Sequence, residues 1–406
     1  MKIYLQLAWR NLWRNKKRTI IASASVFFAV ILAIFTRSMQ LGSYDYMINA
    51  SVSLYTGYLQ VHTKGYWEKK SLNKSMMLSP ETVKNVEVLN NVTDAVPRLE
   101  GFCLASSKSI TKVASVIGID PVKENNMTNL KKKLVSGNYL NGNSNGLLIA
   151  EGLAKLLKVN VGDSIVLYGQ GYHGVTAAGS YKIDGIVKFT LPDLNKTMVY
   201  LTLPLAQYLF GADSRITSLS VMIDNPKKLE DVRNNLINTF GSKYEVLSWS
   251  EMMPDLVQSI EVDNAGGIIM LGILYVVIGF GIFGTIMMMT AERRKEFGVL
   301  IAVGMKKWRL SLVSLLETIM LSLIGVIAGT LASIPLLLYL KDHPIWLTGE
   351  SAQAMLAFGI EPILPFSMAY NIFVDQILVV IFISVLTAYY PVSFIRKLEP
   401  VKALRK

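Results

Sequence analysis

Two short glycine-containing segments match the letter patterns of known catalytic and nucleotide-binding motifs. Residues Gly142–Gly146 read GNSNG and fit the G-x-S-x-G pattern of a serine nucleophile, whereas Gly169–Gly174 read GQGYHG and fit G-x-G-x-x-G. A nucleophile elbow needs a helix after the serine, and a dinucleotide site needs a helix whose N-terminus holds the pyrophosphate. Here the apolar run LLIA follows the first segment, and the strand-like run YKIDGIVKF follows the second. We therefore predict two turns and no catalytic residue.

Residues that bind metals or form disulfides are sparse in this chain. The single cysteine, Cys103, cannot form an intrachain disulfide, and His62, His173 and His343 lie far apart in the sequence. Cys103 is predicted to be a small buried side chain. The phosphate-binding pattern G-x-x-x-x-G-K-[ST] and the zinc pattern H-E-x-x-H do not occur in the sequence. We expect no metal site and no cofactor bound by this chain itself.

The composition is typical of a membrane protein with a water-exposed part. Of the 406 residues, 51% are hydrophobic and 17% are charged, whereas soluble domains carry about 25% charged residues. The net charge of +12 comes from lysines and arginines that cluster beside the apolar segments. This placement favours a membrane-orientation signal over a nucleic-acid-binding face.

Four apolar segments are long enough to cross a bilayer, which requires about 20 residues in a helix. They comprise residues 19–41, 266–290, 310–340 and 372–390. Six lysines and arginines precede the first segment, six lie in residues 291–309 and five in residues 391–406, but only Lys341 lies between the third and fourth segments. The positive-inside rule therefore predicts that both termini and residues 291–309 are cytoplasmic.

The remaining long segment, residues 42–265, is then extracytoplasmic and large enough for a domain. Residues 147–157 read as a strand followed by a short helix, and residues 181–189 and 196–203 alternate as half-buried strands. One helical stripe is predicted from four apolar residues, Leu229, Val232, Leu236 and Phe240. The domain is therefore predicted to be α+β. Its residues 78–133 are expected to form a strand-rich lobe.

Two acidic residues and four small ones stand out within the predicted spans. Glu317 and Asp375 lie near segment ends, where their side chains are expected to reach the membrane interface. The third span carries small residues at three- and four-residue spacing, namely Ser322, Gly325, Gly329 and Ser333. Such a stripe lets helix backbones approach closely. Its partner is either a helix of the same chain or a second chain.

The short segment between the second and third spans reads AERRKEFGVLIAVGMKKWR. Its first half is charged, its second half is apolar, and Gly304 marks a helix end. These features predict a short cytoplasmic helix whose apolar side needs a cover. A lipid surface or a groove on a soluble partner would each provide one.

Several stretches resemble the MacB/FtsX-type ABC transporter permeases. ERRKEFGVLIAVGMKKWRL resembles the family's cytoplasmic signature E-R-x-x-E-[IF]-G-x-L-x-A-x-G, and LAWRNLWRNKKRTI resembles its amphipathic N-terminal helix. YYPVSFIRKLEPVKALRK resembles the C-terminal pattern, with Val392 and Ile395 in place of the usual alanines. Glu317 and the glycines that follow it match an acidic residue and G-x-x-x-G in the family's third span. LLIAEGLAKLLKVNVGDSIVL, YKIDGIVKF and YEVLSWSEMMPDL are similar to the lipoprotein-releasing branch.

The resemblance implies an α-helical membrane protein of the bacterial inner membrane. Four transmembrane helices would carry a large α+β periplasmic domain, MacB-like and spanning residues 42–265, inserted between helices 1 and 2. Residues 1–18 would form a cytoplasmic amphipathic helix, residues 341–371 a periplasmic loop, and residues 391–406 a cytoplasmic tail. Residues 291–309 would hold the coupling helix.

The resemblance also implies partners and the residues that bind them. Two copies of a cytoplasmic ATPase would bind ATP and Mg²⁺ and contact the coupling helix. The implied coupling residues are Glu292, Arg293, Glu296, Phe297, Gly298, Leu300, Ala302 and Gly304. Further implied partners are a second permease chain, identical or paralogous, a lipoprotein substrate, a periplasmic carrier and membrane lipid, but no nucleic acid.

Lipoprotein extraction would require an apolar refuge for acyl chains near the outer leaflet. The predicted lining combines the outer end of the first span with the approach to the second and comprises Ile34, Phe35, Met39, Leu41, Met252, Met253, Leu256, Val257 and Ile260. These residues would otherwise pack the domain onto the membrane. Two other functions remain open: export of a drug, peptide or toxin, for which a fused ATPase is expected, and regulation of a cell-wall hydrolase, for which a small outer domain is expected. Because the chain begins at the first span, a separate ATPase is expected.

Overall fold

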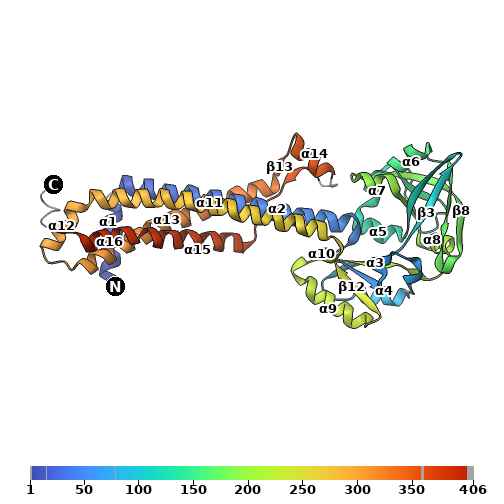
Figure 1. The fold of residues 1–406 in the computed structure, drawn as a ribbon, viewed down its shortest axis with the longest axis horizontal. Coiled ribbons are helices and arrows are strands. Elements are labelled where there is room, and N and C mark those ends of the chain that lie inside the picture. The colour runs from blue at the N-terminus through green and yellow to red at the C-terminus, as the bar shows by residue number, and fades with distance from the viewer. Residues whose placement is uncertain (1, 15, 78, 358–360, 400–406) are drawn as a thin grey trace. The chain divides into compact units, whose positions relative to one another are not determined.

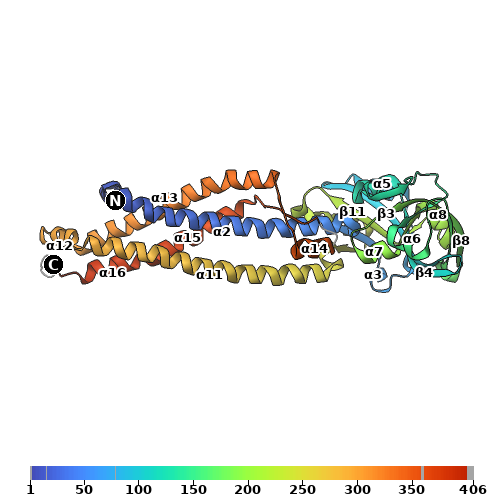
Figure 2. The same cartoon turned by 90° about the horizontal axis from the view of Figure 1, so that it is seen from above.

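The computed structural model describes residues 2–14, 16–77, 79–357 and 361–399 (Figures 1 and 2). Part of the predicted tail, with Lys402, Arg405 and Lys406, and parts of the predicted segments 78–133 and 341–371 lie outside these ranges. The chain forms two compact units. The helical unit comprises Met1–Tyr46, Ser259–Trp346 and Ile363–Lys406, and the mixed unit comprises Met47–Gln258 and Leu347–Pro362.

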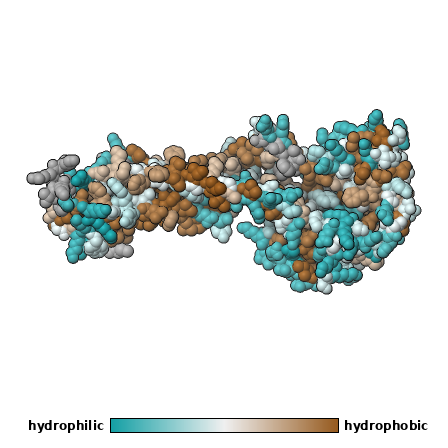
Figure 3. All heavy atoms as spheres, in the orientation of Figure 1, coloured by the Kyte–Doolittle hydropathy of each residue, from teal (hydrophilic) through white to brown (hydrophobic). Residues whose placement is uncertain are grey.

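Seven helices build the described part of the helical unit. They are α1 (Lys2–Arg14), α2 (Lys16–Ser51), α11 (Pro254–Glu292), α12 (Arg294–Ala302), α13 (Lys307–Asp342), α15 (Tyr370–Thr387) and α16 (Tyr389–Lys397). Four helical stretches are long and apolar enough to cross a membrane: Thr19–Thr56, Pro254–Glu292, Lys307–Asp342 and Tyr370–Lys397. Figure 3 shows hydrophobic side chains gathered over these helices.

The long helices extend beyond the spans expected from hydropathy. With 39 residues, α11 is about 58 Å long at 1.5 Å per residue, nearly twice the roughly 30 Å hydrocarbon core. A short hairpin of β13 (Ile345–Trp346) and β14 (Ile363–Leu364), together with α14 (Glu350–Ala357), connects α13 to α15. Parts of α2, α11 and α13, which have 36, 39 and 36 residues, must therefore lie outside the hydrocarbon layer.

The small-residue stripe of α13 packs against α2 of the same chain. A Cβ at Gly325 would lie 2.6 Å from the Cβ of Val26, and a Cβ at Gly329 would lie 2.9 Å from the carbonyl oxygen of Phe27. Real side chains do not approach so closely, so only glycine permits this helix separation. Ser322 and Ser333 on the same stripe are buried. The sequence allowed the stripe to contact either a helix of the same chain or a second chain. The structure shows the contact with a helix of the same chain.

The mixed unit is built around a ten-stranded sheet. Its order is β12-β1-β11-β3-β4-β9-β6-β8-β5, and β7 pairs with both β3 and β8. These strands are β1 (Leu59–Thr63), β3 (Val92–Ser107), β4 (Ile110–Ile119), β5 (Leu134–Gly137), β6 (Leu147–Ala150), β7 (Ser164–Gln170), β8 (Thr176–Val187), β9 (Met198–Thr202), β11 (Ser218–Ile223) and β12 (Tyr244–Ser248). Most pairs are antiparallel, but β4 pairs with β9 and β6 with β8 in parallel.

Helices and a second small sheet complete the mixed unit. The helices are α3 (Tyr66–Lys69), α4 (Pro80–Glu87), α5 (Pro121–Thr128), α6 (Glu151–Leu157), α7 (Pro192–Thr197), α8 (Leu203–Phe210), α9 (Leu229–Phe240) and α10 (Trp249–Met252). The small sheet pairs β2 (Met76–Met77) with β10 (Arg215–Ile216). Val232 and Leu236 of α9 are buried, as the predicted stripe requires. The mixture of helices and largely antiparallel strands agrees with the predicted α+β class.

The segment predicted to be rich in strands, residues 78–133, holds the longest strand pair. β3 and β4 pair antiparallel from Arg98 opposite Ile119 to Ser107 opposite Ile110. Gly101 in β3 leaves room for the ring of Phe210, because a Cβ there would lie 2.5 Å from its Cζ. The described part of residues 78–133 is therefore rich in strand, but β3 and β4 lie within the ten-stranded sheet and do not form a lobe of their own.

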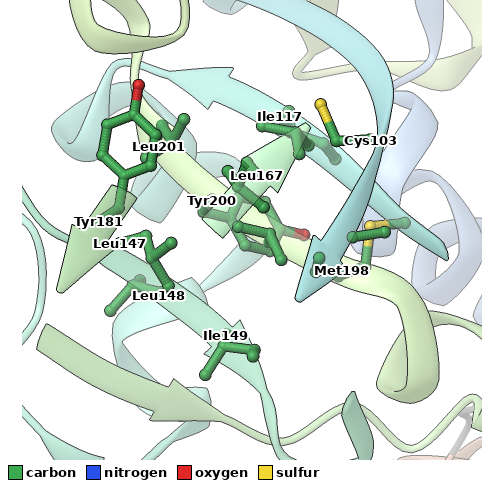
Figure 4. Packing of buried hydrophobic residues seen from close by; sticks show 14 of the residues in the cluster. Cys103, Ile117, Leu147, Leu148, Ile149, Leu167, Tyr181, Met198, Tyr200 and Leu201 are labelled. Atoms are coloured by element: carbon green, nitrogen blue, oxygen red, sulfur yellow. The ribbon is translucent and has the colours of Figure 1, made fainter. Parts of the chain in front are cut away.

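The core of the mixed unit confirms the predictions for the cysteine and for both glycine motifs. Cys103 is 3% exposed among buried apolar side chains (Figure 4), and burial raises the pKa of its thiol to about 11. Residues 142–146 lie in a turn before β6, and residues 171–175 connect β7 to β8. In the second turn the amide of Gly171 donates to the carbonyl of Val175 at 2.6 Å. Neither glycine motif has the strand–turn–helix setting of the chemistry that it resembles.

Candidate coupling site

The helix α12 is separated from α11 and α13 by two residues whose backbone dihedral angles are not helical. Arg293 separates it from α11 with dihedral angles of −87° and 6°. At its other end Gly304 has φ of +105°, a conformation that favours glycine. The amides of Gly304 and Met305 donate to the carbonyls of Ile301 and Leu300, both at 3.0 Å, which satisfies carbonyls at the helix end. This is the short helix that the sequence predicts.

The apolar side chains of α12 divide into an anchored and an exposed group. Phe297 is 1% exposed and packs in a cluster with Leu310, Ile395 and Leu398, from α13, α16 and the residue that follows α16. By contrast Leu300 is 40% exposed and Val303 is 84% exposed. The anchored group fixes the helix to its own chain. The exposed group forms an apolar surface that needs a cover.

The eight predicted coupling residues follow the same division. Five of them are exposed: Glu292, Glu296, Leu300, Ala302 and Gly304. The other three are buried against the same chain: Arg293, Phe297 and Gly298. Only the exposed five are available to a partner, so the buried three hold the helix in position.

The expectation that Glu317 reaches the membrane interface is wrong. Its side chain is 7% exposed and forms an ion pair with Arg293, which is 10% exposed. Asn11 of α1 donates a further hydrogen bond to the same carboxylate at 2.5 Å. An ionised carboxylate avoids burial unless it is paired, and here both partners come from other helices. Asp375 on α15 is exposed, and its position at the membrane interface stays a prediction.

Further ion pairs extend this network to the surface. Glu296 of α12 lies 2.6 Å from Arg14 of α1 and 3.3 Å from Arg293. Exposed pairs contribute about 0–1 kcal/mol each, so they orient more than they stabilise. A groove of about 630 Å³ lies beside them and is lined by α1, α12, α13 and the turn after α12: Leu7, Arg10, Asn11, Arg14, Arg293, Glu296, Val299, Leu300, Met305, Leu310 and Val313.

Sequence reasoning missed that α1 takes part in this site. Asn11 and Arg14 occupy successive turns of α1, which places both on one face of the helix. The one sequence feature that pointed to such a contact was Glu317. A carboxylate within an apolar segment requires a hydrogen-bond donor from elsewhere in the chain. The basic residues of α1 were interpreted only as orientation signals, and Arg293 was predicted to contact the ATPase and not Glu317.

The residues of the predicted acyl-chain lining are buried or half-buried within their own units. Phe35, Met39 and Leu41 are half-buried around Ile34 in the helical unit. Met253 packs in a cluster of the mixed unit, and Met252 is 7% exposed. The remaining three, Leu256, Val257 and Ile260, are half-buried. A role of these nine residues in holding acyl chains stays a prediction.

Comparison with known families assigns the chain to a class of proteins. The family described as MacB-like periplasmic core domain matches residues 19–239, more than half of the chain, and the family described as FtsX-like permease C-terminal matches residues 268–400. The chain therefore belongs to the MacB/FtsX-type ABC transporter permeases. It is a membrane protein with a large domain of the periplasmic MacB type.

Individual relatives are similar over most of the chain. The lipoprotein-releasing system transmembrane protein LolC of Buchnera aphidicola is 21% identical, over 99% of this chain and 98% of the relative. LolE of Haemophilus influenzae, with the same description, is 18% identical over 98% of both chains. The macrolide export ATP-binding/permease protein MacB of Campylobacter jejuni is 20% identical over 99% of this chain, which spans 61% of that relative. These relatives support a cytoplasmic ATPase as the kind of partner.

Proposed function

We propose that this chain is the permease subunit of an ABC transporter that releases lipoproteins from the inner membrane. The observation that carries the proposal is the similarity to LolC and LolE, which covers at least 98% of this chain and of each relative. The ATP and Mg²⁺ are bound by two copies of a separate ATPase, and this chain binds no cofactor itself. A second permease chain, identical or paralogous, completes the transporter.

In this proposal α12 receives the movement of the ATPase. The exposed apolar side chains of Leu300 and Val303 dock on the ATPase, with both termini of the permease in the cytoplasm. Phe297 and the pair of Arg293 with Glu317 tie α12 to α13, so α12 cannot shift without moving the span behind it. The long helices then carry the displacement to the periplasmic domain, where a carrier accepts the lipoprotein.

The proposal includes an apolar refuge for the acyl chains of the lipoprotein. Acyl chains cost about 0.8 kcal/mol per CH₂ when exposed to water, so an extracting machine must cover them. Photo-crosslinkers at Met39, Met252 and Leu256 should capture lipoprotein, and the capture should fall when ATP is supplied to the complex. A crosslinker at Met270, which is 63% exposed on α11, provides the control for unspecific membrane contact. Equal capture at Met270 and at the other three positions would contradict the proposal.

Export of a periplasmic drug or peptide is the second candidate. It is favoured by the similarity to MacB of Campylobacter jejuni across 99% of this chain. Under this function the same crosslinkers would capture the drug or peptide and no lipoprotein. The crosslinking experiment therefore separates the two candidates.

A further inference from the structure

A second groove lies between α12 and α16, apart from the one beside α1. It has a volume of about 430 Å³ and is lined by Arg294 of α12 and by Tyr390, Ser393, Phe394 and Lys397 of α16. The four residues of α16 lie at positions i, i+3, i+4 and i+7, which places them on one face of that helix. Neither the coupling surface of α12 nor the predicted acyl-chain lining uses these residues.

The groove carries two cationic side chains. Arg294 is half-buried and Lys397 is exposed, and both line the groove. The carboxylate of Glu399 also lines the groove and has an interaction partner. Two cations against one carboxylate give the groove a net positive charge.

Two of the α16 residues that line the groove are aromatic. The rings of Tyr390 and Phe394 stack with centroids 6.2 Å apart, and Phe283 of α11 meets Tyr390 edge-on at 5.3 Å. Tyr390 and Phe394 follow directly on α15, whose apolar surface is one of the four candidate spans. Tyrosine and other aromatic residues gather where a span leaves the hydrocarbon layer. The groove thus combines cations with an apolar wall at the end of a membrane span.

We propose that this groove binds the phosphate headgroup of a membrane phospholipid, preferentially an anionic one. The guanidinium of Arg294 offers the planar fork that matches two phosphate oxygens, Lys397 adds a point charge, and the hydroxyl of Ser393 donates a third hydrogen bond. An acyl chain then lies along Tyr390 and Phe394. Basic pockets between helices at the membrane surface bind anionic lipid headgroups in this way. The bound lipid holds α16 against α12.

The test measures lipid binding by the purified full chain in detergent. Labelled phosphatidylglycerol is titrated against the native chain, Arg294→Gln and Lys397→Gln. Each replacement should weaken binding by about fivefold, the factor expected from one cation near a lipid headgroup. Arg294→Lys should fall between the native chain and Arg294→Gln, since it keeps the charge and loses the fork. Matched controls are Lys295→Gln and Arg396→Gln, exposed neighbours on the same helices and outside the groove lining, which should change binding by less than about twofold.

Competition identifies the source of the phosphate. Unlabelled phosphatidylglycerol should displace the label at lower concentration than phosphatidylcholine, and inorganic phosphate should displace it poorly, because it lacks the acyl chain. Equal effects of groove and control variants would overturn the proposal, as would competition by inorganic phosphate at the same concentration as lipid. Unchanged lipid binding by Arg294→Gln and Lys397→Gln would likewise overturn it. The experiment uses neither ATPase nor lipoprotein, so its outcome does not depend on the proposed function.

Discussion

Arg293, between α11 and α12, and Glu317, at the end of the third turn of α13, form a buried ion pair. The pair joins the coupling helix to a membrane span through side chains and not only through the backbone. Asn11 of α1 donates a hydrogen bond to the same carboxylate, so α1, α12 and α13 are tied together at one acidic group.

Breaking the pair from one side should destabilise the protein strongly. Arg293→Gln leaves a buried carboxylate without its counter-charge, a change that costs about 3–5 kcal/mol. The double variant Arg293→Met/Glu317→Leu removes both charges and should be closer to the native chain in stability. Thermal unfolding in detergent measures the effect, with Asp375→Asn as the exposed control. A double variant as unstable as the sum of the single variants would contradict this account.

Adding one methyl group at Gly325 should separate α13 from α2. The Cβ of Gly325→Ala would overlap Val26, and overpacking typically costs about 1–3 kcal/mol. Gly284→Ala on α11 is the matched control, because a Cβ there meets nothing within 4 Å. That control should be neutral or slightly stabilising, since alanine favours a helix over glycine. Loss of helicity in denaturing detergent measures the difference in stability between Gly325→Ala and the control.

The exposed face of α12 should carry the ATPase contact. Leu300→Glu and Val303→Glu place a charge in an apolar contact and should weaken ATPase binding by about tenfold or more. Membrane insertion and thermal stability should remain unchanged, because both side chains are exposed. Val88→Glu, at an equally exposed position of the mixed unit, is the control. Copurification of the ATPase at native levels with both variants would show that another surface carries the contact.

Stability of the mixed unit should fall as the pH decreases from about 6.5 to about 4. Burial lowers the pKa of His62 to about 4, while its Nδ1 lies 3.0 Å from the carbonyl oxygen of Thr217. Between about pH 6.5 and about pH 4 the unfolded chain binds a proton at His62 that the folded chain does not bind. The free energy of unfolding is therefore highest above the unfolded pKa and decreases as the pH falls, by about 3 kcal/mol in all. Hydrogen exchange of β1 in the full chain measures this loss, corrected for intrinsic rates. His62→Gln should reduce the pH dependence, whereas His173→Gln, at an exposed loop, should leave it unchanged.

The orientation in the membrane is open to a direct test. A reporter that is active only outside the cytoplasm should be active when fused after Asn145 and silent when fused after Lys306. The physical reason is the concentration of lysine and arginine in residues 291–309 and in the N-terminal segment. The reverse activity pattern would refute the orientation derived from these charges.

Hydropathy and periodicity predicted those elements that follow simple patterns. The four long apolar helices, the stripe of α9 and the turns at both glycine motifs all appear in the structure. β3 was not readable because Pro97 and Gly101 interrupt it, and both are tolerated only through tertiary contacts such as the ring of Phe210 against Gly101.

The coupling site could be located from the sequence but not resolved into its parts. Residues 291–309 were identified as a short helix with an apolar side, yet the sequence did not show which residues face inward. Arg293 and Glu317 are 24 positions apart and Asn11 is 306 positions from Glu317. No local pattern connects residues at such separations, because their meeting depends on how α1, α12 and α13 pack.

The position of β1 in the sheet determines when the mixed unit is able to fold. β1 is among the first elements of that unit to be synthesised, yet its two neighbours are β11 and β12, which come more than 150 residues later along the chain. Until those strands arrive, both edges of β1 have unpaired backbone groups, and contacts between residues so distant in sequence form slowly. During biosynthesis the unfinished unit therefore passes through an interval in which it is open to misassociation. Dependence on chaperones during this interval is the expected consequence.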